Sequence, residues 1–374
     1  MKVIYDLIHF SKVGWFGGIS KVWLEYFKLL PGSPIEPTFI VGPAHSPVQD
    51  YLEEQQYFGG TVVRESPSGI MRKARKLALY RNFQLLKLNF GGAPAIFHST
   101  DYINPLFKQR NLKVITTIFD MVFWDQKHVM KKNIGYWDKV WSTYHSLRVS
   151  DYIITCSQAS KQAIRRYFPW VADKIVIIPL AIDRSFHTVP IVREKQKNFL
   201  FVGGRNAYKN YDRLLQAFAR FIVRFPDWNL EVVGGTTSQI RAQEAARYHD
   251  LGINEHVIDH GYTEQDKLIT LLQHAGALVI PSLNEGFNIP LLEGMAAGTP
   301  VLSSDIPASK ELGKGYARFF PPTSVEAIVE AMRDLVLHPP SYDQLIEAQK
   351  YARVFRWEDS FRRLLEVYSS CITP

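Results

Sequence analysis

Short apolar runs alternate with amphipathic helical stretches along this chain, and this alternation constrains the fold more than any other feature. In residues 211–225, for example, Leu214, Phe218 and Phe221 recur at the three- and four-residue spacing of one helix face. Strands that alternate with helices form parallel, doubly wound sheets, so the sequence predicts an α/β protein. The expected strands are Lys2–Ile8, Ala95–His98, Lys113–Phe119, Tyr152–Thr155, Ile175–Ile178, Phe199–Val202, Leu230–Val233, Ala277–Ile280 and Pro300–Ser303.

The alternation starts afresh near the middle of the chain. Residues 183–196 are mostly polar and form no clear element, and the run NFLFVGGRN after them indicates a new first strand with a phosphate-type turn. We therefore expect two Rossmann-like domains, residues 1–188 and 189–352. They would face each other across a cleft, because ligands of such sheets bind at the carboxyl ends of the strands. We expect an amphipathic helix in residues 353–374 to pack back toward the N-terminal domain.

Several protein classes are disfavoured. The chain has 374 residues and only two cysteines, Cys156 and Cys371, which are too few for a disulfide scaffold and form no CxxC zinc pair. The opening MKVIYDLIHF is typical of a strand rather than a signal peptide, and no apolar run reaches the length of a membrane span. We expect a cytoplasmic protein, and peripheral attachment at the inner face of the membrane stays open.

Positive charge is concentrated in the first half. Residues 1–185 carry 24 Lys and Arg against 14 Asp and Glu, a net charge of +10, whereas residues 186–374 carry 20 against 22, a net charge of −2. The stretch MRKARKLALYR, residues 71–81, places Arg72, Lys73, Arg75 and Lys76 beside apolar residues. Such a segment can lie on anionic lipid or contact an acceptor. A merely solvated basic helix is an equally good interpretation.

The segment PSLNEGFNIPLLEGMAAGTPV, residues 281–301, carries the strongest chemical signal. Pro290 suits the first turn of a helix, and Gly298 suits the position just after its end. Residues 286–289 would then present free N–H groups at a helix N-terminus, which is an anion site for a diphosphate. Glu285 before the helix and Glu293 inside it could accept hydrogen bonds from sugar hydroxyls.

The Glu-x7-Glu spacing within EGFNIPLLEGMAAGTPV resembles the signature of glycosyltransferase family 4, a retaining family with the GT-B fold. The segments FVGGRNAYKNYDRLLQAFA, HVIDHGYTEQDKL and SQASKQAIRRYF resemble that family as well, and so, more loosely, do GWFGGISKVWLEYFKLL and FHSTDYINP. The resemblance implies a transferase that uses a nucleotide sugar in polysaccharide or lipopolysaccharide biosynthesis.

The resemblance also implies roles for individual residues. Arg205 and Lys209 would neutralise the leaving diphosphate, Glu285 would bind the hexose and Glu293 the ribose. Asp120 is a further catalytic candidate, although a structural carboxylate in a strand-end turn is an equal alternative. The remaining donor-binding candidates are Gly17, Gly18, Gly204, Gly261, Tyr262, Gly286, Phe287, Asn288 and Ile289.

Two positions depart from the family pattern. Phe119 precedes Asp120 where many relatives have histidine, so a sugar-facing imidazole is missing, and His98 or another group would have to replace it. Asn288 stands where glycine is common, but asparagine tolerates a left-handed backbone. We therefore expect altered detail at the loop without loss of function.

The sequence thus predicts a retaining glycosyltransferase that moves a hexosyl unit, with GDP-mannose as the first choice of donor, to a glycan or lipid-linked glycan. The chain contains no Asp-x-Asp, GxGxxG after the first strand, GxxxxGK[ST] or HExxH, so we expect neither a metal nor another cofactor. A GT-B epimerase or phosphorylase is the alternative. A polyanion-binding protein is a remote third possibility, and we expect no nucleic-acid partner.

Overall fold

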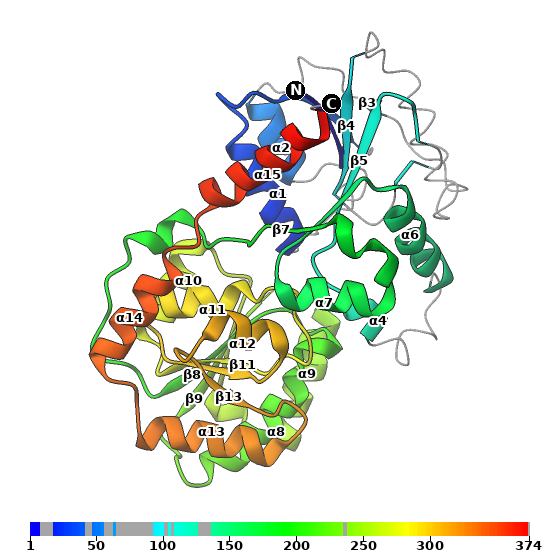
Figure 1. The fold of residues 1–374 in the computed structure, drawn as a ribbon. Helices are drawn as coiled ribbons and strands as arrows, with labels where there is room; N and C mark the ends of the chain where they lie inside the picture. Colours follow the sequence, from blue (N-terminus) through cyan, green and yellow to red (C-terminus); the bar gives the residue numbers. More distant parts are fainter. Residues whose placement is uncertain are drawn as a thin grey trace. The chain divides into compact units, whose positions relative to one another are not determined.

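The computed structural model describes residues 1–7, 18–41, 47–55, 63–64, 93–100, 104–105, 108–125, 136–234 and 238–372. The chain divides into two compact units (Figure 1). Unit 1 comprises Met1–Leu180 and Trp357–Pro374, and unit 2 comprises Ala181–Arg356. The boundaries thus lie at 180/181 and 356/357, where the sequence had indicated 188/189 and 352/353.

Unit 1 is built on a seven-stranded parallel sheet in the order β3-β2-β1-β4-β5-β6-β7. Its helices include α15, which contributes the end of the chain. The strands are β1 (Lys2–Leu7), β2 (Glu36–Val41), β3 (Val63–Arg64), β4 (Ala95–Ser99), β5 (Leu112–Thr117), β6 (Tyr152–Thr155) and β7 (Ile175–Ile177). The helices are α1 (Gly18–Lys28), α2 (Pro47–Glu54), α4 (Val122–Asp125), α6 (Tyr136–Val149), α7 (Gln158–Tyr167), η3 (Pro169–Lys174) and α15 (Trp357–Ile372).

Helix α15 packs within unit 1 although it follows unit 2 in the sequence (red in Figure 1). The ring of Trp357 meets Tyr26 of α1 edge to face, with centroids 5.5 Å apart. Further along the helix, the hydroxyl of Tyr368 lies 3.2 Å from that of Tyr5 in β1. The apolar face of this amphipathic helix therefore forms part of the core of unit 1.

Unit 2 contains a six-stranded parallel sheet in the order β10-β9-β8-β11-β12-β13. The strands are β8 (Asn198–Val202), β9 (Asn229–Val233), β10 (Val257–Gly261), β11 (Ala277–Ile280), β12 (Val301–Ser304) and β13 (Arg318–Phe320). The helices are η4 (Arg184–His187), η5 (Ala207–Lys209), α8 (Tyr211–Ile222), α9 (Ser238–Asp250), η6 (Asn254–His256), α10 (Gln265–His274), α11 (Ile289–Ala296), α12 (Pro307–Gly313), α13 (Val325–Leu337) and α14 (Tyr342–Ala352).

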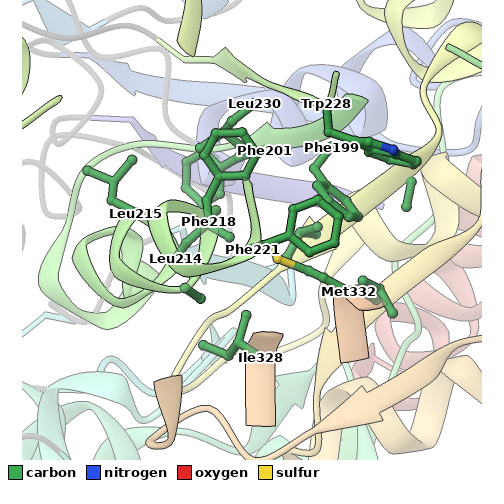
Figure 2. Packing of buried hydrophobic residues seen from close by; sticks show 14 of the residues in the cluster. Phe199, Phe201, Leu214, Leu215, Phe218, Phe221, Trp228, Leu230, Ile328 and Met332 are labelled. Atoms are coloured by element: carbon green, nitrogen blue, oxygen red, sulfur yellow. The ribbon is translucent and has the colours of Figure 1, made fainter. Parts of the chain in front are cut away.

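Helices cover both faces of this second sheet. Side chains alternate between the faces along a strand, and β11 shows the consequence. Val279 packs into a cluster with Phe218 of α8 and Met332 of α13, where Figure 2 shows the apolar side chains of both helices meeting β8. Leu278 faces the other way, since a Cβ built on Gly294 of α11 would lie 2.7 Å from its Cδ2. Both faces of the strand are therefore buried.

The nine predicted strands are confirmed to within two residues at each end, and the predicted helix that begins at Tyr211 is confirmed as α8. Strands β2, β3, β10 and β13 were not among the nine. Strand β2 contains Pro37, which is uncommon inside a strand, and β3 and β13 have only two and three residues. Periodicity cannot distinguish such short segments from loops.

Candidate active site

The turn after β8 is tied to the loop after β11 by one asparagine. Asn210 adopts a left-handed conformation, with φ 59° and ψ 29°, directly after η5. Its side-chain amide donates to the carbonyl oxygens of Pro281, at 2.9 Å, and Pro322, at 2.7 Å. The backbone N–H of Leu283 in turn donates to the carbonyl of Tyr208, at 2.7 Å. These bonds fix the end of η5 against the end of β11.

This arrangement brings Lys209 and Glu285 together. The Nζ atom of Lys209 lies 2.7 Å from Oε1 of Glu285, and the two side chains are only 15% and 11% exposed. The hydroxyl of Ser282 donates to the same carboxylate oxygen, at 2.7 Å. An ammonium group predicted to meet a phosphate and a carboxylate predicted to meet a hexose thus form one largely buried ion pair.

The loop between β11 and α11 has the backbone that its sequence indicated. Asn288 has φ 81° and ψ 58°, which confirms the expected left-handed conformation, and its amide donates to Oγ of Ser309 at 2.9 Å. Pro290 lies in the first turn of α11, and Gly298 follows the helix with φ 70°. The predicted helix is therefore confirmed.

Other donor-binding candidates lie around this helix with different exposure. Phe287 is buried and its ring meets that of Phe355 edge to face, at 6.0 Å. Glu293 lies inside α11 and is 5% exposed. Gly286 and Ile289 lie on either side of the Phe287–Asn288 pair and are only partly buried. The predicted phosphate loop and Glu285 thus lie directly before α11, and Glu293 lies within that helix.

The neighbouring strands β8, β9 and β10 each lead into a glycine: Gly203, Gly234 and Gly261. The N–H of Gly203 donates to the carbonyl of Val233, at 2.9 Å, and the N–H of Gly234 donates to the carbonyl of Gly261, at 2.8 Å. Gly234 has φ 149°, and a Cβ there would lie 2.2 Å from the carbonyl oxygen of Gly203. The strand ends therefore approach one another more closely than side chains would allow.

Arg205 extends from this row of glycines and is almost fully buried. Its guanidinium forms an ion pair with Glu244 of α9 and lies over the ring of Tyr211, with 4.6 Å between Cζ and the ring centroid. Gly204, beside it, is partly exposed. On the next turn, Tyr262 is 65% exposed. Arg205 therefore belongs to a buried cluster, whereas the tyrosine predicted to contact the base is mostly exposed.

The candidates in unit 1 have local contacts. Oδ1 of Asp120 accepts a hydrogen bond from the N–H of Val122, at 3.0 Å, at the start of α4, which is the geometry of the structural alternative. Gly18 begins α1, and a Cβ on it would meet nothing within 4 Å. Gly17 and the basic residues lie outside the described residues. That basic set is Arg72, Lys73, Arg75 and Lys76.

The suggestion that His98 replaces the missing histidine is wrong. His98 is fully buried, and its ring nitrogens lie 2.5 Å from the hydroxyl of Tyr368 and 2.8 Å from that of Thr117. Burial lowers the pKa of its imidazole to about 3, so the ring is neutral. A neutral imidazole enclosed in this way stabilises the core and cannot face a sugar.

Sequence reasoning missed three contributors to the site. Asn210 follows Lys209 at the start of a helix, and its preference for a left-handed backbone was an available signal. Ser282 precedes Glu285 by three residues in the same loop, so its proximity could have been inferred. Glu244 lies within α9 and 39 residues from Arg205, and no local pattern marks it.

Within the described parts of the chain, no three His, Cys, Asp or Glu side chains gather in a way that could hold a metal ion. None of the helices that the structure describes combines the length and apolarity needed to cross a membrane.

The two halves of the chain match two family models. Residues 16–186 match the model described as Glycosyltransferase Family 4, and residues 184–351 match Glycosyl transferases group 1. The O-antigen chain mannosyltransferase B of Escherichia coli is 27% identical over 291 residues, which cover 73% of this chain and 74% of that protein. The MMP alpha-(1->4)-mannosyltransferase of Mycolicibacterium hassiacum is 24% identical over 299 residues, covering 77% and 67%.

Solved structures show the same fold over the whole chain. Sucrose-phosphate synthase from Thermosynechococcus elongatus superposes with a TM-score of 0.74 at 17% identity, covering 99% of this chain and 98% of that one. HepE of Anabaena, solved with UDP and glucose, gives a TM-score of 0.74 at 15% identity, covering 99% and 100%. The predicted GT-B fold class is confirmed.

Proposed function

Since this chain is a GT-B glycosyltransferase whose halves belong to the family 4 and group 1 domains, we propose that it transfers a hexosyl unit from a nucleotide diphosphate sugar to a glycan hydroxyl, with retention of anomeric configuration. Mannose is the first choice of sugar and GDP-mannose of donor. Relatives named as mannosyltransferases support this choice. A glycan or lipid-linked glycan is the acceptor that we propose.

The observation that carries the proposal is the Lys209–Glu285 pair beside the N-terminus of α11. An ammonium group has three N–H donors, so Lys209 can hold Glu285 and a phosphate oxygen at the same time. The leaving diphosphate gains negative charge as the glycosidic bond breaks, and a fixed cation aimed at it lowers the barrier. Glu285 would meanwhile accept hydrogen bonds from the hexose.

We propose that Lys209, Arg205 and the N–H groups at the start of α11 supply the positive charge that a metal supplies in other transferases. Retention would follow from departure and attack on one face of the sugar, with the leaving phosphate as the base. Backbone groups of Phe287, Asn288 and Ile289 would hold the phosphates, and Gly261 and Tyr262 would contact the base.

A screen of nucleoside diphosphates tests the donor. A ligand at about 100 times its Kd stabilises a protein by about 2.7 kcal/mol, so the true nucleotide should raise the Tm without added metal. The anomeric configuration of the product, read by NMR, tests retention. An inverted product would contradict it, and donor turnover that needs no acceptor would favour the epimerase alternative.

Peripheral membrane association is the part of the proposal that concerns unit 1. In the described part of this unit, the large hydrophobic side chains that remain exposed are Trp137, Tyr144 and Trp170. Trp137, Trp141, Tyr144 and Arg148 recur along α6 at the spacing of one helix face, and the ring of Trp170 meets Tyr144 at 5.8 Å. Tryptophan, tyrosine and arginine together suit the interface of an anionic bilayer.

Sedimentation with vesicles tests this association. Binding to phosphatidylglycerol vesicles should exceed binding to phosphatidylcholine vesicles and weaken with salt. Changing Trp137 and Tyr144 to serine should reduce it, whereas the matched change of the exposed Val223 and Val354 of unit 2 should not. Equal binding to both lipids, or an equal effect of both pairs of changes, would refute the association.

A further inference from the structure

Arg205 carries a charge that the protein keeps almost entirely from water. Its side chain is 6% exposed, in the turn between β8 and η5. Burial of a guanidinium is unfavourable unless hydrogen bonds and opposite charges surround it. The partners of this group therefore decide whether it is available to a ligand.

The partners lie on three sides of the guanidinium. Nε donates to Oε1 of Glu244, and Nη1 donates to the carbonyl of Gly203, at 2.8 Å. Nη2 has no hydrogen-bond partner among the described residues and lies 3.8 Å from Oδ1 of Asp259, in β10. The rings of Tyr211 and Phe201 lie 4.6 and 5.6 Å from Cζ. Contacts within unit 2 thus engage the edges and the plane of the guanidinium.

The pair between Arg205 and Glu244 is incomplete. Oε2 of Glu244 is buried without a hydrogen-bond partner, as is Nη2 of Arg205. Burial raises the pKa of Glu244 even though Arg205 opposes the shift. A buried hydrogen-bonding atom without a partner is unfavourable, so this arrangement is less stable than a fully paired one.

A diphosphate offers what the buried pair lacks. Its oxygens can accept two parallel N–H hydrogen bonds from a guanidinium, whereas Glu244 accepts only one from Arg205. A ligand that reaches Arg205 must therefore displace Glu244, and the unpartnered atoms reduce the free energy that this exchange requires.

We propose that Glu244 competes with the donor diphosphate for Arg205, holding the guanidinium in the ligand-free protein and releasing it when the donor binds. This inference rests on the proposed function, since it needs a diphosphate at the site. It gives α9 a role in donor binding, as the helix that sets how readily Arg205 becomes available.

Calorimetric titration with GDP and UDP, set against guanosine and uridine, tests the competition. Glu244→Gln keeps the size of the side chain but removes the competing charge, so the diphosphate should bind at least about tenfold more tightly. Affinity for the nucleoside should stay the same. Arg205→Ala should weaken diphosphate binding, and in that background Glu244→Gln should have no effect.

Glu231→Gln is the matched control. Glu231 is a buried carboxylate in β9 of the same unit, paired with Asn198 and His260 rather than with Arg205, so its change should leave diphosphate affinity unaltered. If Glu244→Gln does not fold, Glu244→Asp, whose shorter side chain should hold Arg205 less well, should also tighten binding.

The possible results distinguish a failure of the competition hypothesis from a failure of the proposed function. Diphosphate affinity that falls in Glu244→Gln as much as in Arg205→Ala would show that Glu244 positions Arg205 for the ligand, and unchanged affinity would make the pair purely structural. Either result would overturn the competition. If the unaltered protein binds no nucleoside diphosphate, the proposed function itself fails.

Discussion

The two units share one strand order but differ in how deeply they bury the ionisable side chain on or after the fourth strand. Counted within each unit, the strands run 3-2-1-4-5-6, with a seventh in unit 1. The fourth strand of unit 1 carries His98, whose imidazole is enclosed by Tyr368 and Thr117. The fourth strand of unit 2 leads to Glu285, which remains 11% exposed beside Lys209. A shared architecture therefore does not fix chemistry, because the depth of each ionisable group decides whether it stabilises the core or meets a ligand.

Removing the ammonium group of Lys209 in unit 2 should have the largest effect on turnover. Lys209→Ala should lower turnover by about 100- to 1000-fold, because one electrostatic group aimed at the transition state is lost. Steady-state kinetics in the presence of EDTA would measure this. Lys310→Ala is the control, since Lys310 forms an exposed pair with Asp305 and should change turnover little. Loss of activity in EDTA that manganese restores would mean that a metal carries the charge.

In unit 1, acid should lower the free energy of unfolding through the protonation of His98. The pKa of His98 is about 3 in the folded protein and about 6.5 in the unfolded one, so the unfolded state binds the extra proton between these values. Stability is therefore fully present above about pH 6.5 and is lost as the pH falls toward 3. Between about pH 7 and about pH 4.5 the contribution of His98 amounts to about 2.5 kcal/mol.

Urea unfolding of His98→Asn at both pH values checks this contribution. The variant should lose about 2.5 kcal/mol less on acidification than the unaltered protein does, whatever its stability at neutral pH. A His98→Asn variant that keeps the full pH dependence of the unaltered protein would mean that His98 does not titrate as its burial implies.

Two further substitutions distinguish the roles of the two carboxylates of unit 2, Glu293 and Glu285. Glu293→Gln should weaken nucleoside diphosphate binding by about 1.5–3 kcal/mol, because a charged hydrogen bond to the ribose is lost. Glu285→Gln should lower turnover but leave that affinity unchanged. Binding titrations and initial rates on both variants provide the measurement. Identical behaviour of the two variants would contradict the assignment of one carboxylate to each sugar.

The smallest effect is expected at Asn288. Glycine there removes the strain of a left-handed residue but also the hydrogen bond to Ser309, and each contributes about 1 kcal/mol. Asn288→Gly should therefore change the free energy of unfolding by less than about 1 kcal/mol. Asn288→Ala keeps the strain and loses the bond, so it should lower the Tm clearly. Equal Tm values for the two variants would show that the backbone conformation matters little.

The sequence predicted what depends on local pattern. The periodicity of the sequence located most strands of both sheets. The run from Glu285 to Gly298 predicted its own helix, because residues close in the chain determine caps and turns. Asn288 was placed correctly for the same reason.

What the sequence did not predict depends on contacts across the fold. His98 has the same chemistry in a core as in a site, and only the arrival of Tyr368, 270 residues later, reveals which applies. Glu244 is likewise an ordinary helical glutamate until α9 is placed beside Arg205, in the turn after β8. The ion pair of Lys209 with Glu285 depends on β8 and β11 being neighbours in the sheet, and the sequence pattern does not give the order of the strands.

Because α15 packs in unit 1, the two units cannot fold in the order in which they begin along the chain. Residues 181–356 are contiguous, so unit 2 can fold on the ribosome as soon as they emerge. Unit 1 begins first but finishes last, because Tyr5 waits for Tyr368, 363 residues away. During that interval the surface of β1 and β4 that α15 will cover stays open to chaperones and proteases. A nascent chain that stalls before α15 would therefore carry a complete second unit and an incomplete first one.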